Sequence, residues 1–173
     1  MIAKVSGAAP GCRTGGFMSG NLRLARLYFL LLGIFAAGRW LQGTAGVPYE
    51  DAHQVFSIVI LTLMSAFYYG AFCRVWLGCP VSRALGLGLT LGVASQLVIL
   101  VATLASYTLG LETYFNAPGA LRVEAAVPVE RALVIRLGGL VVNSLLASLA
   151  GALGWVLGTM LPQAQPRPGA DDE

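Results

Sequence analysis

The sequence predicts an all-α, polytopic membrane protein, a bundle of four transmembrane helices with disordered termini. Only 11% of its 173 residues are charged and 57% are hydrophobic, whereas soluble domains carry about 25% charged residues because their surface faces water. Two uncharged runs, residues 52–73 and 84–111, are long enough to cross about 30 Å of hydrocarbon. We therefore expect one transmembrane domain at residues 22–161, with disordered segments at 1–21 and 162–173.

The first expected helix covers residues 22–42, where an apolar run lies between Arg26 and Arg39. The run alone is short, so the helix requires arginines that reach toward the two interfaces. A cleaved signal peptide is the alternative, because basic residues precede the run and small residues follow it. The preceding residues 1–21 lack any periodicity, which predicts disorder. Met18 is an alternative start of the chain.

The second and third expected helices, residues 52–77 and 81–111, form a hydrophobic hairpin. Asp51 followed by Gln54 resembles a capping box at the start of the second helix. The third helix exceeds the thickness of the hydrocarbon core, so it must tilt or project from the bilayer.

The fourth expected helix covers residues 129–161, with Pro128 suited to its first turn. The connection before it, residues 112–130, is the longest in the domain, and its Asn116 to Gly119 stretch is a turn signal.

The distribution of Lys and Arg predicts that both termini are cytoplasmic, because cytoplasmic loops carry more of these residues. With four crossings, seven basic residues lie on the side of the termini and four on the other side. The abundance of Arg, Ala, Gly and Leu suggests a GC-rich bacterial genome, so the expected location of this multi-pass protein is a bacterial inner membrane. The basic residues on the inner side are Lys4, Arg13, Arg23, Arg26, Arg74, Arg83 and Arg167, and those on the outer side are Arg39, Arg122, Arg131 and Arg136.

Small residues recur at helical spacing in the third and fourth helices, which lets helix backbones approach closely. We expect these faces to pack inside one chain, and the alternative is a contact between copies or with another protein. The helix-packing residues are Gly88, Gly92, Ala147, Gly151, Gly154 and Gly158.

One polar side chain in each helix falls at a similar depth in the outer leaflet: Arg39, Thr62, Gln96 and Asn143. At about 1.5 Å per residue they lie about 5–12 Å below the outer edge of the hydrocarbon. We expect hydrogen bonds between helices at this layer that fix the helix register, with Arg39 anchored at the interface. The alternative is a small polar cavity open to the outer surface, in which Arg39 faces an anion.

Motifs that would carry catalysis or metal binding are missing from the sequence. It contains no HExxH, GxSxG or Walker A pattern, and one histidine with three cysteines fits no zinc-finger spacing. We expect Glu50, Asp51 and His53 to form a solvated loop and helix cap rather than a cation or haem site. The sequence thus predicts no enzymatic activity, no cofactor and no metal.

The leading functional hypothesis is a non-catalytic subunit or scaffold that acts through helix–helix packing. The alternative is a small-solute or lipid transporter or channel that uses the polar layer. The expected partners are the lipid bilayer and other membrane proteins or a second copy of the chain. A nucleic-acid partner is not expected, because the sequence has no basic stripe.

Overall fold

A computed structural model describes residues 25–161 of the protein, and all regular structure in this range is helical. The expectations for residues 1–21 and 162–173, and the alternative start at Met18, lie outside the described residues. The all-α class is confirmed for these residues. Three helices are long and apolar enough to cross a bilayer, which is compatible with a multi-pass membrane protein: α4 (Ile58–Val75), α5 (Val81–Leu109) and α7 (Val129–Gly158). A bundle of four crossings is not established.

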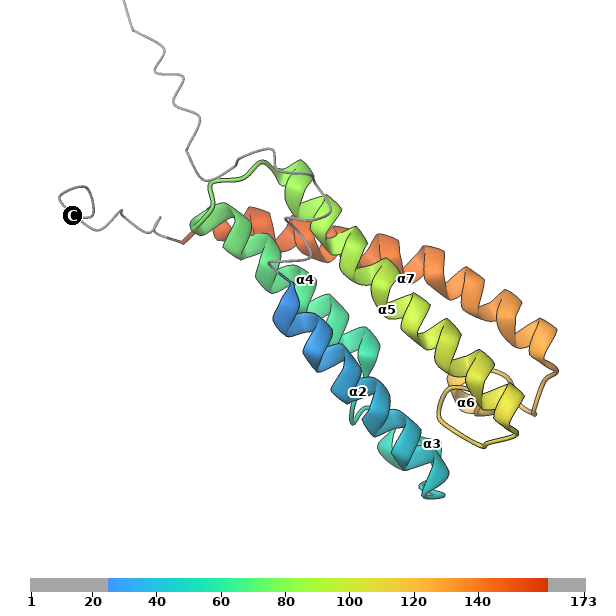
Figure 1. Cartoon of the computed structure of the whole chain (residues 1–173). Helices are drawn as coiled ribbons and strands as arrows, with labels where there is room; N and C mark the ends of the chain where they lie inside the picture. Colours follow the sequence, from blue (N-terminus) through green and yellow to red (C-terminus); the bar gives the residue numbers. More distant parts are fainter. Residues whose placement is uncertain (1–24, 162–173) are drawn as a thin grey trace, which may run out of the picture.

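The remaining long helix, α2 (Arg26–Thr44), lies beside α4 (Figure 1). It is not among the three candidate spans, because Arg39 and Gln42 reduce the hydropathy of its second half. A buried tyrosine ties α2 to the other helices. The Tyr28 hydroxyl lies 2.9 Å from Thr62 Oγ1 of α4 and donates to the Leu91 carbonyl of α5 at 3.2 Å.

Small residues allow α4, α5 and α7 to meet backbone to backbone. Gly70 of α4 faces the Gly151 carbonyl of α7, and a Cβ at Gly92 of α5 would lie 2.7 Å from Ser144 Cα. Any larger side chain at these positions would force the helices apart. The predicted packing residues all lie in contacts among α4, α5 and α7, inside the chain: Gly88, Gly92, Ala147, Gly151, Gly154 and Gly158.

The second expected helix begins later than the sequence indicates. Its start was expected at residue 52 after the cap at Asp51, but Tyr49–Ala52 forms a separate short helix, α3. Phe56, with a φ of 57°, then turns the chain. The actual N-cap is Ser57, whose hydroxyl accepts a hydrogen bond from a backbone N–H of the first turn of α4 at 3.5 Å.

The connection between α5 and α7 folds back on the bundle. The helix α5 ends at Gly110, which adopts the left-handed conformation (φ 63°) typical of helix C-termini. A short helix, α6 (Pro118–Leu121), follows at the position of the expected turn. Figure 1 shows α3 and α6 at the same end of the bundle, which we call the loop end.

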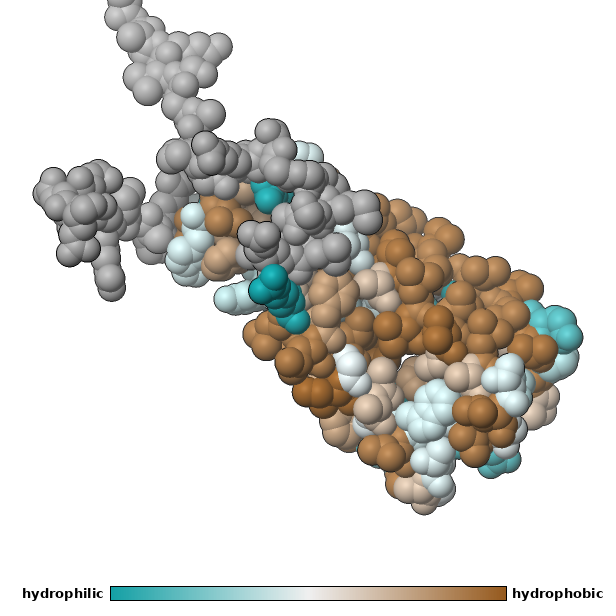
Figure 2. Space-filling model, viewed as in Figure 1, coloured by the Kyte–Doolittle hydropathy of each residue, from teal (hydrophilic) through white to brown (hydrophobic). Residues whose placement is uncertain are grey.

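The long sides of the bundle present apolar side chains, as a lipid-facing surface requires. Figure 2 shows a largely hydrophobic surface along the bundle, with most of the hydrophilic residues near its ends. The helix α7 contributes many of the exposed apolar side chains, among them Val134, Val141, Leu145, Leu149, Leu153 and Val156.

Candidate functional site

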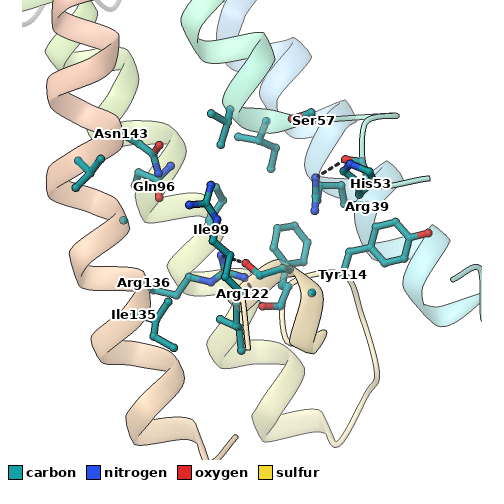
Figure 3. A pocket seen from close by; sticks show the side chains of 18 of the residues that line it. Arg39, His53, Ser57, Gln96, Ile99, Tyr114, Arg122, Ile135, Arg136 and Asn143 are labelled. Atoms are coloured by element: carbon teal, nitrogen blue, oxygen red, sulfur yellow. Dashed lines mark hydrogen bonds between the residues drawn. The ribbon is translucent and has the colours of Figure 1, made fainter. Parts of the chain in front are cut away.

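A pocket of about 600 Å³ lies at the loop end of the bundle, in the fork where α4 and α7 separate. The two helices touch at the other end, where Gly154 of α7 faces the Phe67 carbonyl of α4. Toward the loop end, residues 58–60 of α4 and 135–146 of α7 form opposite walls. Residues of α5 form the back of this fork pocket and α6 forms its floor (Figure 3).

Arg39 lies on the α2 side of the fork pocket. Its guanidinium carbon lies 5.8 Å from the centre of the Tyr49 ring and 5.7 Å from that of Tyr114. Within the described chain, Arg39 donates only one hydrogen bond, which is long at 3.4 Å and goes to the His53 carbonyl. The aromatic rings therefore orient the guanidinium, while most of its five N–H donors remain available.

Arg136 lies on the α7 side and fixes the connection that forms the floor. Its guanidinium donates to the Phe115 carbonyl at 2.5 Å, to the Ala120 carbonyl at 3.5 Å and to Thr103 Oγ1 at 3.2 Å. All three acceptors are neutral, so these bonds hold the connection in place without neutralising the arginine.

Two side-chain amides line the back of the fork pocket. Gln96 of α5 and Asn143 of α7 both lie beside Gly139, and a Cβ at that glycine would be 3.6 Å from each amide. The Gln96 side chain is only 4% exposed, yet neither amide makes a hydrogen bond within residues 25–161. Buried amides nearly always have partners. The Gln96 amide therefore faces the pocket with unused donors and acceptors.

The fork pocket carries positive charge without a matching negative one. Arg39, Arg122 and Arg136 line it, and no Asp or Glu is among its lining residues. None of these arginines forms an ion pair in the described part of the chain. Arg39 and Arg136 also repel each other electrostatically. Such an arrangement is suited to an anion, for which arginine provides planar, often bidentate hydrogen bonding.

The loop end of the fork pocket is covered by contacts between α3 and α6. Tyr49 of α3 packs against Gly119 of α6, where a Cβ would lie 2.7 Å from the ring. Its ring also meets Tyr114 edge to face at 5.3 Å. Burial raises the pKa of Tyr114, and its hydroxyl donates a hydrogen bond to the Pro48 carbonyl at 3.1 Å.

Three of the four residues of the predicted polar layer line the fork pocket: Arg39, Gln96 and Asn143. The fourth, Thr62, is buried elsewhere, between α2 and α4. Its hydroxyl pairs with Tyr28 and donates to the Ile58 carbonyl at 2.7 Å. Thr62 thus fixes helix packing, as the hydrogen-bonding hypothesis expects, while the other three residues surround a cavity.

Two arginines of the fork pocket are absent from the predicted layer. Arg136 follows Arg131 at the start of the fourth helix and was assigned to the outer boundary. The structure places it inside α7, facing the connection. Arg122 belongs to the connection itself and adopts a left-handed conformation (φ 57°). Only the position of Arg136 within an apolar helix could have signalled its role, because charges there are rare and functional.

The acidic residues near α3 do not gather into a metal site. His53 lines the fork pocket, with its Nδ1 atom 3.0 Å from the Glu50 carbonyl and its ring stacked on Tyr49. Glu50 and Asp51 are exposed in the first turn of α3. Within residues 25–161, no three His, Cys, Asp or Glu side chains lie together as metal ligands would.

Comparison of the chain with protein-family models, with curated proteins and with solved structures gave no significant match.

Proposed function

We propose that the protein is an integral membrane protein that binds and handles an anionic solute or lipid in the fork pocket. The main support is the set of groups around the cavity: three arginines, no carboxylate, and the buried Gln96 amide without a partner. This function corresponds to the transporter or channel alternative that the sequence suggests.

A charged side chain inside a membrane raises the free energy of the protein. An arginine at the centre of a transmembrane helix costs about 2.5–3.5 kcal/mol on insertion scales. Arg136 recovers part of this cost through its neutral acceptors, whereas Arg39 has one long hydrogen bond. A bound anion offsets the remaining cost, since it pairs with cations that the protein itself leaves unmatched.

Under this proposal α2 is a fourth crossing, although it is shorter and more polar than the other three helices. Both termini are then cytoplasmic, and the fork pocket lies in the outer leaflet of a bacterial inner membrane. The support for this orientation is the bias in basic residues along the sequence, of which Arg39 and Arg136 line the pocket and do not lie in an outer loop. A reporter fused at Glu173 that is active only outside the cell contradicts this orientation.

The binding proposal is tested with the full chain in nonionic detergent. Native mass spectrometry and thermal unfolding are recorded with inorganic phosphate, with glycerol 3-phosphate and with phosphatidic acid. A ligand at ten times its dissociation constant raises the stability by about 1.4 kcal/mol. We expect Arg39→Gln and Gln96→Leu to remove this gain for at least one anion.

Arg131→Gln is the matched control, because Arg131 is exposed at the same end of the bundle but does not line the fork pocket. Binding should survive this change. If no anion binds, or if the Arg39 and Gln96 variants bind as the unaltered protein does, the proposed function is wrong.

The subunit or scaffold hypothesis stays a prediction of lower rank. The predicted small-residue faces are used within the chain, so a partner would have to pack on the exposed apolar side chains of α7. Those side chains are equally suited to lipid. Co-purification of a stoichiometric membrane partner in mild detergent would restore this hypothesis to the first place.

A further inference from the structure

We propose that the anion is the phosphate headgroup of a lipid, which reaches the fork pocket sideways from the bilayer between α4 and α7. This inference rests on the proposed function and adds the class of ligand and its route.

The edges of the fork are apolar and exposed. Ile60 on α4 is 54% exposed, and Val142 and Leu146 on α7 are 57% and 45% exposed. All three line the pocket and belong to its opposite walls. A polar interior between apolar edges matches a molecule whose head is charged and whose tail remains in hydrocarbon.

The position of the pocket along α7 places it beside lipid chains. Its α7 lining runs from Ile135 to Leu146, which is about 9–26 Å from the start of the helix at 1.5 Å per residue. A soluble anion would enter at the loop end, but there the contact of Tyr49 with Gly119 covers the pocket. Along the side of the fork, Ile60 of α4 and Leu146 of α7 both line the pocket and are exposed within the described part of the chain, so a lipid can approach between them.

The polar groups fit a phosphate attached to a larger molecule. Arg39 and Arg122 offer guanidinium donors, and the Gln96 and Asn143 amides lie deeper in the same cavity. Basic pockets between transmembrane helices are typical sites for lipid headgroups. A cavity of about 600 Å³ exceeds the needs of an inorganic ion and is within the range of about 300–1,000 Å³ for organic ligands.

The test compares two sources of the same phosphate chemistry. The full chain in nonionic detergent is titrated with dioleoyl phosphatidic acid and with glycerol 3-phosphate, and bound ligand is counted by native mass spectrometry. Dioleoyl phosphatidylcholine has the same tails, but its choline group balances the charge of its phosphate, so it is the net-neutral lipid control. We expect phosphatidic acid to bind at least about tenfold more tightly than either, because the headgroup and the tail both contribute.

Substitutions at two equally exposed residues test whether the lipid enters through the fork. Val141 and Val142 are each 57% exposed, but only Val142 lines the pocket. Val142→Trp should weaken phosphatidic acid binding about tenfold by obstructing the fork, and Val141→Trp should leave it unchanged. Arg39→Gln and Arg122→Gln should each weaken binding by about tenfold through the loss of a charged hydrogen-bond donor, whereas Arg131→Gln should not.

The outcomes distinguish this inference from the proposed function. If glycerol 3-phosphate binds as tightly as phosphatidic acid, the lipid ligand is wrong and anion binding stands. If Val141→Trp and Val142→Trp weaken binding equally, or phosphatidylcholine binds as well as phosphatidic acid, the inference is also overturned. If phosphatidic acid does not bind, the lipid ligand is wrong; if glycerol 3-phosphate and inorganic phosphate do not bind either, both proposals fail.

Discussion

The helices α4 and α7 pack closely in one half of the bundle and separate around a pocket in the other half. In the half away from the loop end, Gly70, Gly151 and Gly154 bring α4 and α7 into backbone contact. In the half at the loop end, the same two helices separate around arginines and amides. The close contact in one half holds the helices while the other half stays open. The pocket can therefore stay open although two of its arginines, Arg39 and Arg136, carry like charge.

The largest effect is expected from a methyl group added in the closely packed half. Gly154→Ala places a Cβ against the Phe67 carbonyl, so α7 must move away from α4. Overpacking against backbone atoms costs about 3 kcal/mol. The free energy of unfolding, measured by denaturant titration in detergent, should fall by this amount.

The control for this change is Gly33→Ala in α2, where no atom lies within 4 Å of the added Cβ. It should leave the stability unchanged or raise it by up to about 1 kcal/mol, since alanine favours the helix. Equal losses for the two variants would show that the glycine contacts do not hold the bundle.

In the open half, Arg136→Gln should detach the connection from α7. The substitution removes the hydrogen bonds to the Phe115 and Ala120 carbonyls. It also removes a buried charge, which offsets part of the loss, so the free energy of unfolding should fall by about 2 kcal/mol. Hydrogen exchange of residues 111–122 should accelerate, while exchange in α4 should not change. Arg131→Gln is the control. If exchange of residues 111–122 accelerates equally in this variant, Arg136 does not hold the connection.

The attachment of α2 is tested by a smaller change. Tyr28→Phe removes the hydroxyl that bonds to Thr62 and Leu91, which should cost about 1 kcal/mol. Thr62→Val in the same background should add little, because the two side chains share one hydrogen bond. Additive losses in this double-mutant cycle would mean that the two hydroxyls do not interact.

The smallest effect is expected at the start of α4. Ser57→Ala removes the N-cap, and the long 3.5 Å bond places the loss near about 0.5 kcal/mol, the low end for such caps. If Asp51→Ala lowers the free energy of unfolding by this amount and Ser57→Ala does not, the helix begins at residue 52 and Ser57 is not its N-cap.

The helices were largely predictable from the sequence, because length and apolar runs are local properties. The expected third and fourth helices, 81–111 and 129–161, match α5 and α7 to within a few residues. The start of α4 was not predictable, since Asp51 lies inside a separate short helix and the reversal at Phe56 leaves no pattern in the sequence.

The sequence predicted how far along each helix the site residues lie, but not toward which neighbour each side chain points. Counting residues along each helix put Arg39, Gln96 and Asn143 at one level, and these three do surround the fork pocket. The same arithmetic included Thr62, which faces α2, because depth does not determine how a helix is rotated about its axis. Arg122 was out of reach, since its position depends on a connection that folds back under the bundle.

The contacts of Arg136 also have a consequence for the order in which the protein is made. The floor of the fork pocket, formed by α6, is synthesised before α7, but Arg136, which donates to the Ala120 carbonyl of α6, belongs to α7. Asn143 and the glycines that hold α4 arrive with the same helix. A nascent chain that has reached Pro128 therefore includes the helices α2 to α6 but lacks the α7 wall of the pocket. Under the proposed function, we therefore expect that an incomplete chain without α7 does not bind the ligand during biogenesis.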